Sequence, residues 1–328
     1  MQKLNSMVLG AAITAAVTMG ASGAAHAGAS AYATLDINNF TLGSTLLGRQ
    51  FDVADFDTVN VNNTSTNSGS ASGFIAPPPN TQVDNTLGGG NADDNRICVG
   101  ACGGTVGTDD SFVQHAVGAN AHFTSADNVL LGALITGLGP QSFVNAIDYA
   151  EGATSETASG QGSSQVGTGT NFSFNLTNDD QLIFDFDGTP FIDVLLHQDD
   201  VATQGSISYS ININIAGTNT TVFSWSPSGS AGGITGGTEI SDEVNINTQR
   251  DQLDAGNTQY NPGTGHFRAI SDTLLADTTY TLSIAHGADA DYNAIKAPPV
   301  PAPTSLALLG AGLFGVSAFA RRRRAKKA

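Results

Sequence analysis

Alternating apolar and polar residues form the clearest pattern in the chain. Between residues 206 and 215, isoleucine or tyrosine occupies every second position, and serine or asparagine occupies the positions between them. A period of two is typical of a β-strand with one buried face and one face in water. The same alternation recurs at residues 172–176, 182–186, 192–196, 223–225, 244–246 and 280–284.

Turn-forming residues separate several of these segments. Ser226-Pro227-Ser228-Gly229 and Asn261-Pro262-Gly263 have the composition of turns, and Gly188-Thr189-Pro190 is expected to end one strand before the next begins. About seven short strands at this spacing predict a mainly β fold, either an antiparallel β-sandwich or a jelly roll, over residues 170–290.

The N-terminal half is less regular. Residues 32–40 and 51–61 are predicted as strands and the polar residues 62–72 as a loop. Residues 127–135 are apolar enough for a short helix, and a buried strand fits them equally well. The glycine- and serine-rich residues 152–170 predict a flexible junction, which either divides two domains or bridges two strands of one.

The first 27 residues have the features of a secretory signal peptide. Lys3 supplies a positive start, residues 7–19 are apolar and small, and Ala25-His26-Ala27 is an A-x-A cleavage pattern. The apolar run is shorter than the ~20 residues that a membrane span needs. We therefore expect a signal peptidase to cut after Ala27, leaving an exported passenger of residues 28–296.

Residues 297–328 form a tail of three parts. The proline-rich residues 297–303 are expected to be extended, because proline fixes φ and lacks an amide hydrogen. Thr304–Ala320 contain no charge and predict a single transmembrane helix of about 25 Å. Arg321, Arg322, Arg323 and Arg324 follow at once, with two lysines behind them. Such a cluster stops translocation in the inner membrane and keeps this end in the cytoplasm.

This tail, V-P-A-P-T-S-L-A-L-L-G-A-G-L-F-G followed by R-R-R-R, resembles the PEP-CTERM sorting signal. The resemblance implies that an exosortase recognises the tail and cuts near the proline motif Val300, Pro301, Ala302 and Pro303. One position departs from the family's Pro-Glu-Pro, since Ala302 replaces the acidic residue. The family further implies transient membrane anchoring, then release to the cell surface or an extracellular matrix linked to exopolysaccharide or biofilm.

The passenger also resembles one subfamily of proteins with this tail, the EDSAP type. The similarity lies in three sequence segments, FSFNLTNDDQLIFDFDGTPFIDV, VFSWSP and FRAISDTLLADTTYTLSIAHG. No Glu-Asp-Ser-Ala-Pro signature is present, and the subfamily has no established activity. This resemblance therefore bears on the fold and not on the function.

The passenger is far more acidic than the whole chain, whose net charge is −17. All 29 acidic residues lie in it against five basic ones, which makes a net charge of −24 once signal and tail are removed. Such a surface repels nucleic acid and anionic lipid, so nucleic-acid binding is excluded. It keeps the passenger soluble and would attract divalent cations.

The two cysteines, Cys98 and Cys102, have three residues between them, as Cys-x-x-x-Cys, in a protein predicted to be exported. In an oxidising compartment this spacing favours a local disulfide that pins a loop. No second pair of ligands has the spacing of a zinc site, and the C-x-x-C of redox enzymes is absent.

Acidic side chains are the candidates for metal binding. Asp185 and Asp187 point to the same face of a predicted strand and could bind calcium through their oxygens. The alternative is a solvated acidic edge that prevents strand pairing between molecules. Because no complete calcium loop is present, we expect no resident metal or other cofactor.

No catalytic motif is found in the passenger. Its histidines follow neither an H-E-x-x-H nor another recognisable pattern, and no G-x-S-x-G is present; they are His115, His122, His197, His266 and His286. Trp225 is the natural candidate to stack on a sugar, although its place on a strand favours the core.

We therefore expect a non-enzymatic surface or matrix protein, processed by signal peptidase and exosortase and in contact with exopolysaccharide. The alternative is a carbohydrate-binding β-sandwich, assisted by calcium, and a secreted hydrolase ranks third.

Overall fold

The computed structural model describes residues 27–51, 53–74, 84–88, 92–100, 112, 114–115, 121–134, 143–155, 159–197 and 201–294. These residues belong to one compact unit, Met1–Ile295, and the predicted tail forms a second unit, Lys296–Ala328, outside the described residues. Among the described residues, no helix is long and apolar enough to span a membrane.

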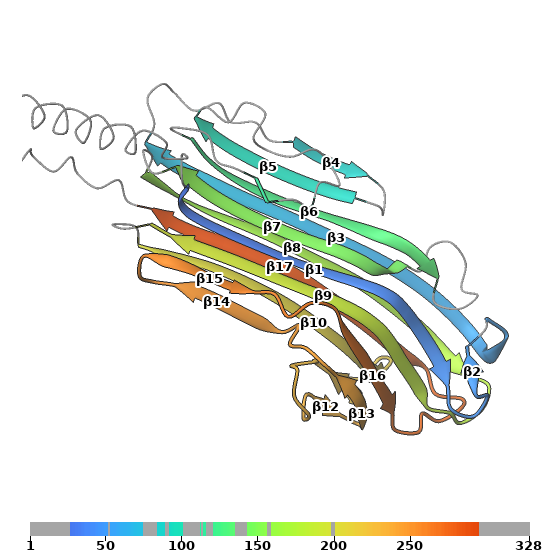
Figure 1. The fold of residues 1–328 in the computed structure, drawn as a ribbon. Coiled ribbons are helices and arrows are strands. Elements are labelled where there is room, and N and C mark those ends of the chain that lie inside the picture. Colours follow the sequence, from blue (N-terminus) through green and yellow to red (C-terminus); the bar gives the residue numbers. More distant parts are fainter. Residues whose placement is uncertain are drawn as a thin grey trace, which may run out of the picture. The chain divides into compact units, whose positions relative to one another are not determined.

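The described residues form two antiparallel sheets (Figure 1). The ten-stranded sheet has the order β13 (Gly237–Asp242), β16 (Gly265–Ser271), β9 (Leu182–Leu196), β1 (Ala27–Ser44), β7 (Phe143–Ser155), β6 (Ala121–Leu134), β5 (Ala92–Gly100) and β4 (Asp84–Gly88). In addition, β15 (Gly256–Tyr260) pairs with β9, and β2 (Arg49–Gln50) pairs with β1.

The seven-stranded sheet has the order β12 (Ile234–Thr235), β11 (Thr221–Trp225), β10 (Ala202–Ile215), β17 (Tyr280–Ala294), β8 (Ser159–Leu176) and β3 (Phe56–Phe74), with β14 (Thr248–Gln252) paired to β10. One 3-10 turn, η1 (Val53–Asp55), precedes β3. The predicted antiparallel β fold is thus confirmed for the described part of the chain.

Aromatic rings from both sheets meet in the core between them. Phe186 of β9 lies 4.8 Å from the ring of Tyr209 on β10 and 5.6 Å from Trp225 on β11, measured between centroids. Phe267 of β16 stacks on Phe186 at 5.0 Å. The two sheets therefore pack face to face as a sandwich, and the apolar half of the alternating pattern is its core.

The alternation identified β8, β9, β10, β11 and β17 correctly, but two details were wrong. Gly188-Thr189-Pro190 is no turn, because β9 runs unbroken through it. Pro190 lies opposite Leu35 of β1. On the other side of β9, the pairing with β16 ends at Gly188 and the pairing with β15 covers only Ile192–Leu196. This gap in the ladder accommodates a residue without an amide hydrogen.

The second error concerns residues 244–246, which belong to no strand. Val244 and Ile246 lie in the connection between β13 and β14, which makes only an isolated bridge from Asn245 to Ser228. Ile246 is nevertheless fully buried. Its burial in the core, rather than a strand, accounts for the apolar spacing.

The N-terminal half is more regular than the sequence indicates. Residues 62–72, predicted as a loop, lie within β3, and residues 127–134 lie in β6, so the helix alternative is wrong. The predicted flexible junction at 152–170 is also wrong. Apart from residues 156–158, which are not described, it consists of the end of β7 and most of β8.

Close packing of rings explains why these strands are rich in glycine. A Cβ atom on Gly162 of β8 would lie 2.4 Å from Cε1 of Tyr292, and one on Gly152 of β7 would lie 2.7 Å from Cδ1 of the same ring. On Gly160 it would lie 2.2 Å from Cε1 of His122. Glycine is therefore needed here for the space it leaves, and not for flexibility.

Candidate functional site

The outer surface of the seven-stranded sheet is the most extensive candidate site. Along β8, β10 and β17 the residues that alternate with the core residues are, apart from Gly287, partly or fully exposed, and most carry a hydroxyl or an amide. We call this surface the polar face. Its polar residues are Gln161, Ser163, Gln165, Asn171, Ser173 and Asn175 of β8; Gln204, Ser206, Ser208, Ser210, Asn212 and Asn214 of β10; and Thr281, Ser283, Asp289, Asp291 and Asn293 of β17.

Strand register arranges these side chains in rows. Asn171, Ser283 and Asn212 lie opposite one another on β8, β17 and β10, and Ser283 Oγ donates a 2.7 Å hydrogen bond to Asn171 Oδ1. Rows of this kind repeat about every 7 Å along a strand and about 5 Å between strands. The sheet therefore presents a regular array of short hydrogen-bonding groups.

Charge is scarce on the polar face. Strands β8, β10 and β17 hold only Asp289 and Asp291 of the 29 acidic residues. Ser206 Oγ donates a 3.1 Å hydrogen bond to Asp289 Oδ2. Burial raises the pKa of Asp289 above its ordinary value, and the neighbouring Asp291 adds to the increase. A nearly neutral face on so acidic a protein is suited to a ligand with little charge.

Trp225 does not contribute to this face. Its side chain is fully buried, and Nε1 donates a 2.7 Å hydrogen bond to Glu239 Oε1. The expected core position is confirmed, and a role as an exposed sugar-stacking platform is ruled out.

Asp185 and Asp187 do share one face of β9, and three neighbours contact them there. Asn39 donates a 2.7 Å hydrogen bond to Asp187 Oδ2, and the His266 ring lies 3.1 Å from Asp187 Oδ1. Arg268 donates to Asp185 Oδ2 at 3.1 Å. The hydrogen bond from Asn39 and the contact with His266 lower the pKa of Asp187. Among the described residues, no group of three or more histidine, cysteine or acidic side chains has the arrangement of a metal site.

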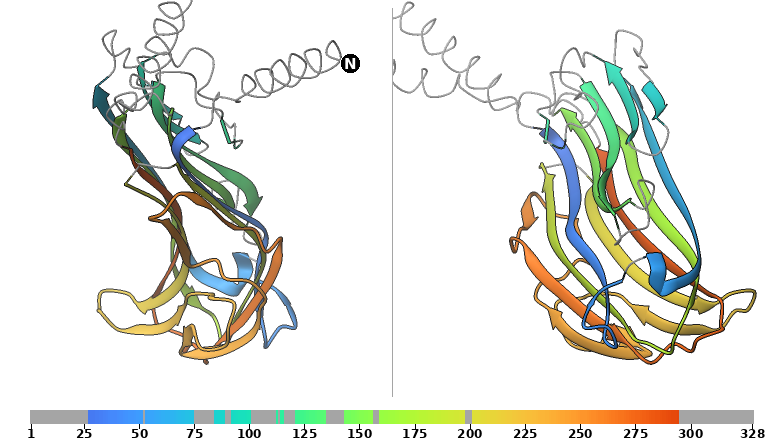
Figure 2. Two further views of the ribbon diagram at one scale, coloured as in Figure 1. Left: turned by 60° about the vertical axis from the view of Figure 1, so that its left-hand side comes forward. Right: turned by 90° about the vertical axis from the view of Figure 1, so that its right-hand side faces the viewer.

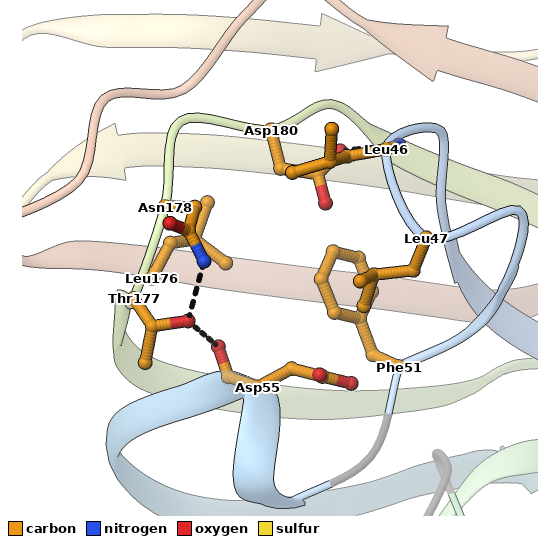
Figure 3. A pocket seen from close by; sticks show the side chains of 8 residues that line it. All are labelled: Leu46, Leu47, Phe51, Asp55, Leu176, Thr177, Asn178 and Asp180. Atoms are coloured by element: carbon orange, nitrogen blue, oxygen red, sulfur yellow. Dashed lines mark hydrogen bonds between the residues drawn. The ribbon is translucent and has the colours of Figure 1, made fainter.

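A shallow pocket lies where the loop after β1 meets the β8–β9 connection (Figure 3). It contains about 20 Å³ of free space, which is room for about one water molecule. Its lining residues are Leu46, Leu47, Phe51, Asp55, Leu176, Thr177, Asn178 and Asp180.

Asp180 organises that pocket and is not available to a ligand. Its Oδ1 accepts hydrogen bonds from the amides of Leu46 at 3.0 Å and Gln181 at 2.7 Å, and Ser44 Oγ donates to its other oxygen. Asp179 accepts the amide of Ala276 at 2.7 Å. Asp179 and Asp180 therefore fix the conformation of the loops whose amides and hydroxyl they bind.

A cluster of His115, Tyr149 and Glu151, which the sequence did not reveal, lies on the outer side of the ten-stranded sheet. His115 donates its backbone amide to Glu151 Oε1 at 2.8 Å, and its ring Nδ1 lies 2.8 Å from Oε2 of the same residue. The hydroxyl of Tyr149 also donates to Glu151. Burial and the Glu151 carboxylate raise the pKa of Tyr149 well above its ordinary value. These contacts hold His115 against β7. The Glu151 side chain is almost fully buried.

The remaining predicted residues are only partly described. Cys98 is buried at the end of β5, but Cys102 lies outside the described residues, so the disulfide stays a prediction. Ala27 is the first residue of β1, and Ala25 lies outside. The proline motif and the arginine cluster also lie outside the described residues.

Comparison with family models identifies the tail. Residues 299–324 match the PEP-CTERM protein-sorting motif. The chain carries a PEP-CTERM sorting signal. The match spans Val300–Pro303 and Arg321–Arg324, so Ala302 does not prevent recognition of the motif by its family model. The PEP-CTERM tail indicates an exported protein that is anchored transiently in the membrane and processed by an exosortase.

No curated protein and no solved structure matches the chain.

Proposed function

We propose that this protein is a non-enzymatic component of the cell surface or extracellular matrix, and that its polar face binds exopolysaccharide. The observation that carries the proposal is the array of hydroxyl and amide side chains on β8, β10 and β17 of an exosortase-sorted chain. It supports a binding role because the array is extended and solvent-facing.

The chemistry of the array matches that of a polyol. Serine and threonine hydroxyls and asparagine and glutamine amides each donate and accept hydrogen bonds, as sugar hydroxyls do. One such contact in water contributes about 1 kcal/mol or less. Binding of a long polymer would therefore depend on many simultaneous contacts along the rows.

The two carboxylates restrict the class of polymer. Asp289 and Asp291 lie in neighbouring rows of one strand, beside Ser206 and Gln204 of β10. They would repel uronic acid or sulfate groups, so the preferred ligand is a neutral polysaccharide.

Binding can be tested by co-sedimentation of the purified full chain with an insoluble neutral glucan and with an insoluble polyuronate. In a variant with Ser208→Ala, Asn212→Ala and Ser283→Ala, we expect retention on the glucan to fall at least about tenfold, the loss of about 1.4 kcal/mol. A matched control changes three exposed residues outside the face, Ser230→Ala, Asn257→Ala and Gln259→Ala, and should bind normally. The proposed role of the face would be refuted if the protein binds neither polymer. It would also be refuted if the face variant and the control variant lose glucan binding to the same extent.

Sorting is tested separately by deleting Thr304–Ala328 in cells. We expect the truncated protein to be lost from the membrane fraction and released without further processing. If its location and size match those of the intact protein, the tail does not sort it.

A further inference from the structure

One edge of the seven-stranded sheet is long and, among the described strands, has no partner. Strand β3 pairs with β8 from Phe56 to Phe74, and no described strand pairs with its other side. Figure 2 shows β3 at one margin of the sandwich. In an antiparallel ladder, about half of the amide and carbonyl groups of an edge strand point away from its neighbour. Those groups are a template for another strand.

The other described edges are short or covered. On its side away from β1, strand β9 is paired with β15 and β16. On its side away from β17, strand β10 is paired with β14 and β11. The ten-stranded sheet ends, on the side away from β13, at β4, which is only five residues long. At 19 residues, β3 is the longest edge strand among the described ones.

The sequence of β3 also lacks the devices that protect edge strands. Such strands ordinarily carry charged residues, proline or a bulge. From Thr58 to Phe74 the strand contains no charged residue and no proline, and its one irregularity lies at its start, between Phe56 and Thr58.

We propose that β3 is a self-association edge, at which a second copy of this chain adds its own β3 in antiparallel orientation. A two-fold axis perpendicular to the sheet, between the two β3 strands, relates the two copies. Each copy then contributes the same edge to the interface. The two seven-stranded sheets would then continue as one sheet of 14 strands. The polar faces of the two copies would become continuous.

Charge explains why two such acidic molecules would meet at this edge. Each passenger carries 24 net negative charges, and β3 contributes only Asp57, near its start. Approach along the uncharged segment Thr58–Phe74 keeps most carboxylates apart, and salt screens the rest beyond about 8–10 Å. Association should therefore strengthen with salt, whereas an interface built on ion pairs would weaken.

The test measures the mass of the full chain in mild detergent by light scattering, at low and high salt, over a range of protein concentrations. We expect a monomer–dimer equilibrium that shifts to dimer at high salt. In a variant with Thr64→Glu and Thr66→Glu, four carboxylates would meet near the two-fold axis, and the dimer should dissociate at least about tenfold more readily. The control, Ser208→Glu with Ser210→Glu, adds the same charge on the central strand β10 and should dimerise normally.

Oxidative crosslinking gives a second readout that does not depend on the glutamate variant folding. Ser65→Cys should form a disulfide between two copies, and Ser208→Cys should not. A protein that stays monomeric and uncrosslinked at every concentration and salt level would overturn the proposal, as would a dimer unaffected by the β3 glutamates. These outcomes are independent of polysaccharide binding.

Discussion

The carboxylate of Asp148 on β7 and the imidazole of His286 on β17 form a hydrogen-bonded pair between the two sheets. Both side chains are at most 1% exposed. Thr168 of β8 donates to Asp148 Oδ1 at 2.7 Å, and Asn128 of β6 donates to the Thr168 hydroxyl at 2.9 Å. Four strands of the two sheets thus share one buried polar network.

Removing one member of this pair should destabilise the sandwich strongly. In Asp148→Ala, the buried imidazole loses its partner, at a cost of about 3–5 kcal/mol. His286→Ala should cost a similar amount. The double variant should cost clearly less than the two single changes together, because the orphaned group is then gone. Urea unfolding of the four proteins measures this, and additive costs would show that the two residues do not interact.

Glycine at position 162 should be required by the Tyr292 ring. Gly162→Val would place its Cβ atom 2.4 Å from Cε1 of that ring and its methyl groups in the same space, so we expect a loss of at least about 2 kcal/mol from overpacking. Ser163→Val adds the branched side chain at the next residue, on the exposed face of the same strand. This control variant should change the thermal midpoint little. An equal decrease in the thermal midpoints of the Gly162→Val and Ser163→Val variants would contradict a steric cause.

Asp180 should hold the loop of residues 44–48 in place. Asp180→Ala removes an acceptor for the Leu46 and Gln181 amides and for the Ser44 hydroxyl, and each hydrogen bond to a carboxylate contributes about 1.5–3 kcal/mol. Hydrogen exchange should then accelerate in the peptide that covers residues 44–48. The exposed Asp254 serves as control, and Asp254→Ala should leave exchange in this loop unchanged.

The alkaline limit of stability should depend on Tyr32. Burial, with help from Glu151, raises the pKa of its phenol to about 12, against 10 in an ordinary tyrosine. Because the folded state holds this proton more tightly than the unfolded state, its contribution is complete below pH 10 and is lost as pH rises toward 12.

Tyr32→Phe should therefore lower stability at neutral pH by about 1 kcal/mol, through the lost 2.8 Å hydrogen bond to the Phe112 carbonyl, and should flatten the fall above pH 10. Unfolding curves at pH 8, 10 and 11 measure both effects. A parallel decline in the two proteins above pH 10 would show that Tyr32 ionises normally.

Local periodicity was sufficient to identify much of this fold. Alternation requires only that one side of a strand be buried, so Ile207–Ile213, Phe223 with Trp225, and Tyr280–Ile284 could be assigned to strands and to the core from their spacing. The tail was equally readable, because its proline motif, apolar segment and arginine cluster follow one another directly in the chain.

Tertiary structure decided what depends on distant partners. The glycines at 152, 160 and 162 indicate a flexible segment until Tyr292 and His122 are seen to occupy the space above them. Pro190 predicts a turn until the neighbouring strands are seen to leave a gap beside it.

The pairing of Asp148 with His286 joins residues 138 positions apart and has no local signature. The sequence by itself thus determined that β8, β9, β10, β11 and β17 are strands, because burial alternates along them, and that the chain carries a sorting signal. The packing of one sheet on the other decided the rest, because a residue's local pattern does not show which side chain faces it.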